Sequence, residues 1–255
     1  MSLAVGWLSV GAALAYLALA GLVGMELVRF GSRRGFSQFG TAFVLMAGAI
    51  GVHHVLEGVN AFGGGAVTSS LIVDALVIGL LPAAVFVALR AELALGGRGD
   101  RFLAGTPWWL RAVPWVGTFA GGVLAAAVAD HVARHGVALW KTWPSIVLTI
   151  AYAAAGLLFV RAQTARREAT GGFSVSGLAL AAMFPTCAVM QATTAATGGV
   201  DVTLFLVDVA TVPASAWFLL STLRLHRSVL RDWNRRPLVG RPRPTKRPSP
   251  WATRA

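Results

Sequence analysis

Long apolar stretches separated by short polar segments make up most of the chain. Seven of them are long enough to cross about 30 Å of hydrocarbon as helices, at about 1.5 Å per residue. None alternates apolar and polar residues with period two, as the strands of a membrane barrel do. The pattern therefore predicts an all-α integral membrane protein with a seven-helix bundle in residues 1–233. The expected spans are 3–28, 39–62, 67–89, 113–135, 143–160, 173–197 and 202–223.

Basic residues fall almost entirely on one side of the expected membrane. An odd number of spans puts the two termini on opposite sides, and 20 of the 22 lysines and arginines lie on the C-terminal side. The other side receives Arg134 and Lys141. Because cytoplasmic segments carry the excess of Lys and Arg, we expect the N-terminus outside and the C-terminus in the cytoplasm. We expect a bacterial or archaeal cytoplasmic membrane.

The composition narrows the possible partners. Charged residues make up 13% of the chain, against about 25% in soluble domains, so lipid is expected to cover the surface. The net charge of +12 follows the membrane topology, which argues against specific nucleic-acid binding. Residues 234–255 form an Arg- and Pro-rich tail that we expect to be disordered and to contact anionic lipid. The single cysteine excludes a disulfide framework and multi-cysteine metal sites.

Ionisable residues gather in the outer third of the expected bundle. On a helix, Glu57 shares one face with His53 at i,i+4 and another with His54 at i,i+3, and His131 and His135 form a second i,i+4 pair. Each ionisable side chain in lipid costs roughly 2.5–3.5 kcal/mol. We therefore expect these groups to face one another around a single outward-facing polar cavity. Counting residues along each span places four more polar residues at this depth: Asp74, Asp130, Gln191 and Asp208.

The residue types in this cavity favour a transition metal. Imidazole binds zinc, copper and iron, and a histidine pair at i,i+4 supplies two ligands from one helix. We expect zinc first, with copper or haem iron as alternatives. If the protein is an enzyme, these residues favour a hydrolase, in which metal-activated water attacks the substrate. The expected metal ligands are His53, His54, His131, His135 and Asp74, and the candidate general bases are Glu57 and Asp130; Gln191 and Asp208 line the cavity.

Three other interpretations use the same residues. A haem held by two histidines between the second and fourth spans would make the protein an electron-transfer subunit. A metal-free cavity would instead bind a solute or protons, as in a transporter or receptor. The third interpretation is structural: interfacial histidines and helix-end carboxylates that hydrogen-bond to one another or to water.

The last span resembles the seventh helix of the microbial rhodopsins over residues 205–212, around Asp208. That resemblance implies a retinal-binding lysine four residues later, where this chain has Val212. The lysines of the chain, Lys141 and Lys246, lie in a loop and in the tail. A retinal Schiff base is therefore excluded, and the resemblance is confined to one helix.

The order of metal-binding residues is similar to that of a seven-helix hydrolase superfamily that includes alkaline ceramidases and adiponectin-receptor-like proteins. That similarity implies a zinc site with a histidine on the second helix, an aspartate on the third and a His-x-x-x-His pair. His53 or His54 and Asp74 match the first two positions. The pair of this chain, His131 and His135, stands on the fourth span instead of the last. We assign the chain to neither family.

Overall fold

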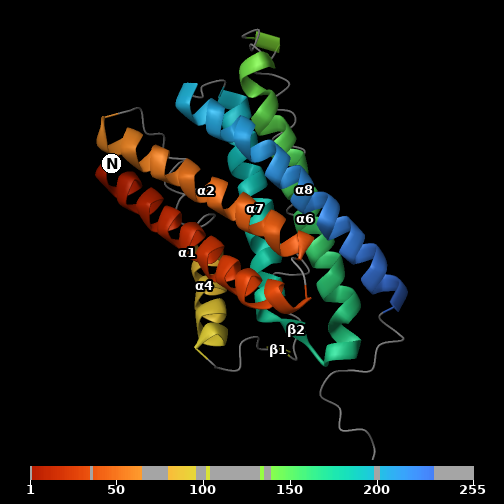
Figure 1. Ribbon diagram of the computed structural model, residues 1–255. Coiled ribbons are helices and arrows are strands. Elements are labelled where there is room, and N and C mark those ends of the chain that lie inside the picture. Colours follow the sequence, from red (N-terminus) through yellow and green to blue (C-terminus); the bar gives the residue numbers. More distant parts are fainter. Residues whose placement is uncertain are drawn as a thin grey trace, which may run out of the picture.

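The computed structural model describes residues 2–34, 37–64, 80–95, 102–103, 133–134, 139–197 and 202–232. Within these ranges the chain is helical apart from two short strands (Figure 1). Five of the described helices are long and apolar enough to cross a membrane, which supports a polytopic integral membrane protein. The main helices are α1 (Ser2–Arg34), α2 (Gln38–Phe62), α4 (Leu81–Ala94), α6 (Leu139–Thr170), α7 (Val175–Thr197) and α8 (Val202–Asp232).

The helices match five of the expected spans, and three of them extend well beyond the apolar stretch. α1, α6 and α8 continue into arginine-containing polar sequence at their C-terminal ends, and Arg is a good helix former. The expected span 67–89 overlaps α4, and its first part lies outside the described residues. The expected span 113–135 also lies outside them, apart from residues 133–134. The seven-helix count and the orientation therefore stay predictions.

The α1–α2 hairpin is stabilised by a helix cap at the start of α2 and by a glycine at the interface between the two helices. Ser37 is the N-cap of α2, and its Oγ accepts a hydrogen bond from the Gly40 amide at 3.2 Å, which satisfies one of the free donors of the first turn. Along the interface, a Cβ at Gly51 would lie 2.8 Å from Cγ of Leu17. A glycine at this position therefore lets the two helices approach closely.

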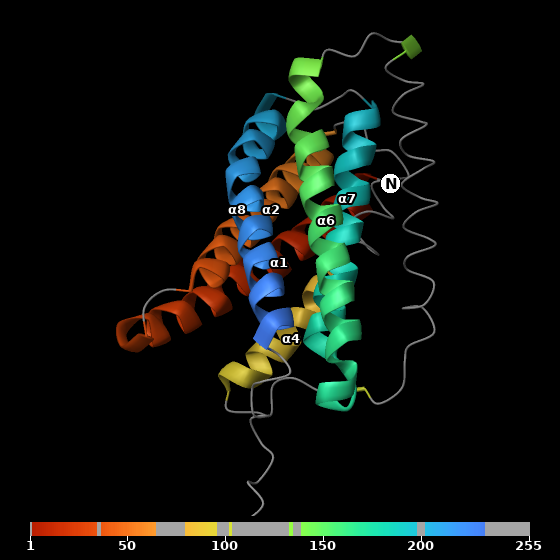
Figure 2. The same cartoon turned by 90° about the vertical axis from the view of Figure 1, so that its right-hand side faces the viewer.

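An aromatic cluster joins α2, α6, α7 and α8 in the interior. Phe184 and Phe218 stack with ring centroids 5.1 Å apart, and Phe159 stacks on both. Figure 2 shows α8 beside α2, and α6 packs against α7 and α8. On the outside, Trp7, Leu14 and Ile150 are each more than 60% exposed. Such apolar surfaces are rare on monomeric soluble proteins, and lipid accounts for them here.

One end of the bundle, which we call the basic end, contains arginines that contact neighbouring helices. It contains the C-terminal ends of α1, α4, α6 and α8 and the N-terminal ends of α2 and α7 (Figure 1). Arg90 pairs with Glu26, and Arg224 donates to Gln38. Two strands, β1 (Phe102–Leu103) and β2 (Phe173–Ser174), pair antiparallel at the same end. We call the opposite end the histidine end.

Candidate functional site

Five of the residues that the sequence singles out lie together near the histidine end. They come from α2 and from the consecutive helices α7 and α8, which are distant from α2 in sequence. The two histidines, the glutamine and the aspartate are almost fully buried, and the glutamate side chain is 14% exposed. This histidine cluster consists of His53, His54, Glu57, Gln191 and Asp208.

A single carboxylate holds both imidazoles. Glu57 Oε2 lies 2.8 Å from His54 Nδ1, and Glu57 Oε1 lies 3.2 Å from His53 Nε2. The spacings i,i+3 and i,i+4 place Glu57 one turn beyond both histidines, so the two contacts arise within one helix. The two rings are nearly perpendicular, with an interplanar angle of 87°. Their other ring nitrogens therefore point in different directions.

Asp208 brings a second carboxylate to the cluster from α8. Its Oδ1 lies 3.2 Å from His53 Nδ1, within ion-pair distance, although His53 Nδ1 makes no aligned hydrogen bond. Ser145 Oγ of α6 donates to Asp208 Oδ2 at 3.2 Å, and Gln191 Nε2 of α7 donates to Oδ1 at 3.5 Å. The imidazole of His53 therefore lies between two carboxylates.

Unpartnered polar atoms concentrate in this cluster. Among the buried side chains that the structure describes, four nitrogen or oxygen atoms have no hydrogen-bond partner, and three of them are His53 Nδ1, His54 Nε2 and Gln191 Oε1. Buried polar atoms are nearly always hydrogen-bonded, and an unsatisfied one costs about 1–3 kcal/mol. A ligand that bonds to these atoms would remove that cost.

Two residues of the site were missed by the sequence analysis. Tyr16 of α1 stacks on His54 with ring centroids 5.6 Å apart, and its hydroxyl lies 3.4 Å from Cys187 Sγ. Ser145 binds Asp208 as described above. The sequence contained a feature that could have identified Tyr16, because the chain has two tyrosines and this one interrupts an apolar span. A serine in a membrane helix is too common to stand out.

The remaining predicted residues are Asp74, Asp130, His131 and His135, and all four lie outside the described residues. Within the described ranges, no group of three or more His, Cys, Asp or Glu side chains is arranged to hold a metal ion. The metal ligand set stays a prediction. What the described residues do provide is a pair of oriented imidazoles beside two carboxylates.

Comparisons with protein-family models, curated proteins and solved structures give no significant match for this chain. The histidine cluster and its position inside a helical membrane protein therefore provide the basis for a proposed function. Ionisable groups within membrane helices generally mark ligand or ion sites, because their burial is costly.

Proposed function

We propose that this polytopic membrane protein binds a transition metal ion at the histidine cluster, with His54 as one ligand. One observation carries the proposal: His54 Nδ1 contacts the Glu57 carboxylate at 2.8 Å, while its buried Nε2 has no partner. Histidines that bind metals almost always donate their other ring N–H to a carboxylate, carbonyl or water, which fixes the ring and exposes one lone pair. His54 has this arrangement.

The charge of the cluster also favours a cation. The carboxylates of Glu57 and Asp208 contact imidazoles, a serine hydroxyl and an amide. A bound cation would compensate two negative charges that lie away from water. Imidazole and carboxylate groups together suit zinc first, with copper and iron as alternatives.

The further ligands of the proposed site are those that the sequence predicts. His131 and His135 supply an i,i+4 pair, and Asp74 supplies a carboxylate. In a hydrolase, Asp130 would accept the proton of the metal-activated water. Both oxygens of Glu57 contact imidazoles, which supports a positioning role for Glu57 in place of the predicted role as a base.

Metal content of the purified full-length protein tests the proposal. The protein in detergent is offered zinc, copper and iron in turn and analysed by elemental mass spectrometry. We expect about one metal ion per chain, and a loss of that ion in His54→Ala and in the double variant His131→Ala/His135→Ala. The matched control is His226→Ala, because His226 lies on α8 toward the basic end. A folded wild-type protein without metal would contradict the proposal, and a visible Soret band would assign a haem.

A second function, without a metal, is favoured by the position of His53. Its ring nitrogens lie 3.2 Å from an oxygen of Glu57 and 3.2 Å from an oxygen of Asp208, an arrangement in which an imidazole passes protons between two acids. A transporter or receptor for protons or a cationic solute would use it. In reconstituted vesicles, this function predicts pH-dependent uptake or binding that a metal chelator leaves unchanged.

The proposal includes an orientation in the membrane. The arginine contacts at the basic end agree with a cytoplasmic location for that end, and the histidine cluster then faces outward in a bacterial or archaeal cytoplasmic membrane. The basic tail, residues 234–255, would meet the anionic lipid of the inner leaflet.

A further inference from the structure

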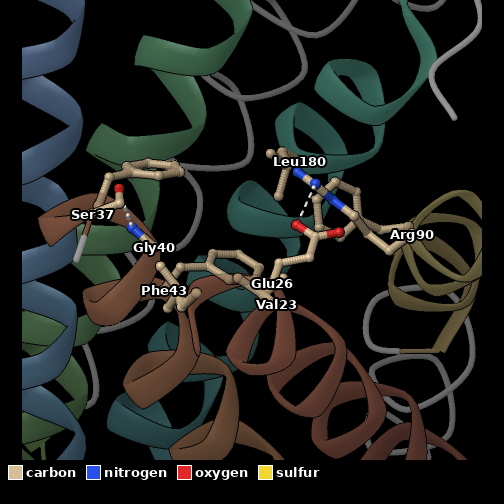
Figure 3. Close-up of a pocket in the computed structure, with 10 residues that line it drawn as sticks. Val23, Glu26, Ser37, Gly40, Phe43, Arg90 and Leu180 are labelled. Carbon is tan, nitrogen blue, oxygen red and sulfur yellow. Dashed lines mark hydrogen bonds and ion pairs between the residues drawn. The ribbon is translucent and has the colours of Figure 1, made fainter. Parts of the chain in front are cut away.

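A cavity of about 260 Å³ opens at the basic end, between α1, α2, α4 and α7. It is separate from the histidine cluster, because no residue is shared between the two. Its polar side chains are Glu26, Ser37 and Arg90, and the remainder of its lining is apolar (Figure 3). The apolar lining consists of Val23, Leu27, Phe39, Gly40, Phe43, Phe86 and Leu180.

Two opposite charges stand side by side in this cavity. Arg90 Nη1 donates to Glu26 Oε2 at 3.2 Å, and Figure 3 shows this contact. Both side chains are partly exposed, at 32% and 26%. A guanidinium has five N–H donors and a carboxylate has about four acceptor positions. Within the ion pair, the guanidinium of Arg90 can therefore donate further hydrogen bonds, and the carboxylate of Glu26 can accept further ones.

Aromatic and aliphatic groups lie directly against the charges. The guanidinium carbon of Arg90 is 5.2 Å from the centroid of the Phe86 ring. Phe43 contacts Phe86 with ring centroids 5.9 Å apart. The cavity thus combines a charged rim with an apolar lining, which is the character of a site for an amphiphile.

The polar residues of the cavity lie near helix ends, where lipid headgroups would meet a membrane-spanning bundle. Glu26 stands three residues before Arg29 in the last part of α1, and Ser37 caps the start of α2. Arg90 lies four residues before the end of α4. In a helical membrane protein, charged residues at helix ends reach the boundary between acyl chains and water. A lipid of the surrounding leaflet has direct access to this level.

We propose that the cavity binds the headgroup and upper acyl chain of a zwitterionic ethanolamine phospholipid. The phosphate would bind Arg90, the ammonium would bind Glu26, and the chain would follow Phe43 and Phe86. Charge complementarity selects this occupant, because the phosphate of an anionic lipid would meet Glu26 without a compensating ammonium. The volume is below the range of roughly 300–1,000 Å³ for sites that enclose a ligand, which fits a lipid that remains largely in the bilayer.

The test uses two photoreactive lipids with the same diazirine-labelled acyl chain, one phosphatidylethanolamine and one phosphatidylglycerol. Each is added to the full-length protein in maltoside micelles, and crosslinked peptides are mapped by mass spectrometry. We expect crosslinks of the ethanolamine lipid on the cavity-lining parts of α2 and α4, with about tenfold higher yield than for the glycerol lipid, as one charge-assisted contact implies.

Two variants separate binding from folding. Arg90→Gln should lower the yield of both lipids in the cavity about tenfold, because both contain a phosphate. Glu26→Gln should lower the yield of the ethanolamine lipid and leave that of the glycerol lipid unchanged or higher. The matched control is Arg227→Gln, because Arg227 is exposed on α8 and does not line the cavity.

Three results would overturn the proposal. Crosslinks of the ethanolamine lipid that map outside the cavity would place the lipid elsewhere. Equal or higher cavity yields for the glycerol lipid in the wild type would assign the cavity to anionic lipid. Equal losses of crosslinking yield for both lipids in Glu26→Gln would show that the ion pair has only a structural role.

Discussion

Glu57 is the residue on which the geometry of the histidine cluster depends most. Its two oxygens fix both imidazole rings, and hydrogen bonds to a charged group contribute about 1.5–3 kcal/mol each. Without the carboxylate, both rings would lose a partner inside the membrane protein. Glu57 therefore sets the direction of His54 Nε2, the atom that we propose as a metal ligand.

We predict that Glu57→Gln lowers the affinity for the metal about 10–100-fold, because an amide binds the imidazoles less strongly than a carboxylate. Competition with a chromogenic chelator measures the change. Glu26→Gln serves as the control, since it removes an acid at the basic end and should leave metal affinity unchanged. Unaltered affinity in Glu57→Gln would exclude the positioning role.

Cys187 offers a second prediction at the scale of a residue. It is the one cysteine of the chain, it is buried, and its sulfur contacts the hydroxyl of Tyr16. We predict that a maleimide leaves the folded protein unmodified over a period in which it labels the denatured protein completely. Intact-mass spectrometry measures the labelling. Rapid labelling of the folded protein would contradict the burial of this thiol.

Helix packing in this protein depends on glycines that face bulky side chains. Between α6 and α7, a Cβ at Gly156 would lie 2.6 Å from Cδ and Cγ of Pro185. The proline ring is rigid, so it cannot move away as a flexible side chain would. The contact therefore holds α6 and α7 at a short distance, as small residues do in membrane bundles.

We predict that Gly156→Ala lowers the free energy of unfolding by about 1–3 kcal/mol, the usual cost of overpacking. Gly48→Ala is the matched control: it also replaces a helical glycine, but its Cβ would meet nothing within 4 Å. The control should be neutral or stabilising, since alanine favours helix over glycine by about 1 kcal/mol. The denaturant dependence of Cys187 labelling measures both variants, and equal stabilities would contradict the packing argument.

The whole molecule is polarised along its helix axes. The histidine cluster lies near one end, and the arginine contacts and the cavity beside Arg90 lie at the other. A membrane around the bundle would give these two ends different environments. The function of each site thus depends on which end faces the cytoplasm.

We predict that the basic end is cytoplasmic. In a Cys187→Ala background, Gly63→Cys at the end of α2 should react with a membrane-impermeant maleimide in intact cells. Leu95→Cys at the end of α4 should react only after the cells have been permeabilised. Both positions are exposed, so access depends on the side of the membrane. The reverse pattern would overturn the orientation and place the histidine cluster toward the cytoplasm.

The sequence by itself determined the features that depend on one helix at a time. Apolar length predicted the helices that match α1, α2, α6, α7 and α8, because a helix must satisfy its own backbone in lipid. Helical periodicity placed Glu57 beside both His53 and His54. A rise of about 1.5 Å per residue put Asp208 and Gln191 at a similar depth.

Only the tertiary structure decided which side chains meet at that depth. Depth along a helix says nothing about its rotation or its neighbours, which result from the packing of all side chains together. The contact of Asp208 with His53, the stacking of Tyr16 on His54 and the cavity beside Arg90 all depend on that packing. Local sequence thus fixes the level of each polar group, and the packed bundle fixes its partner.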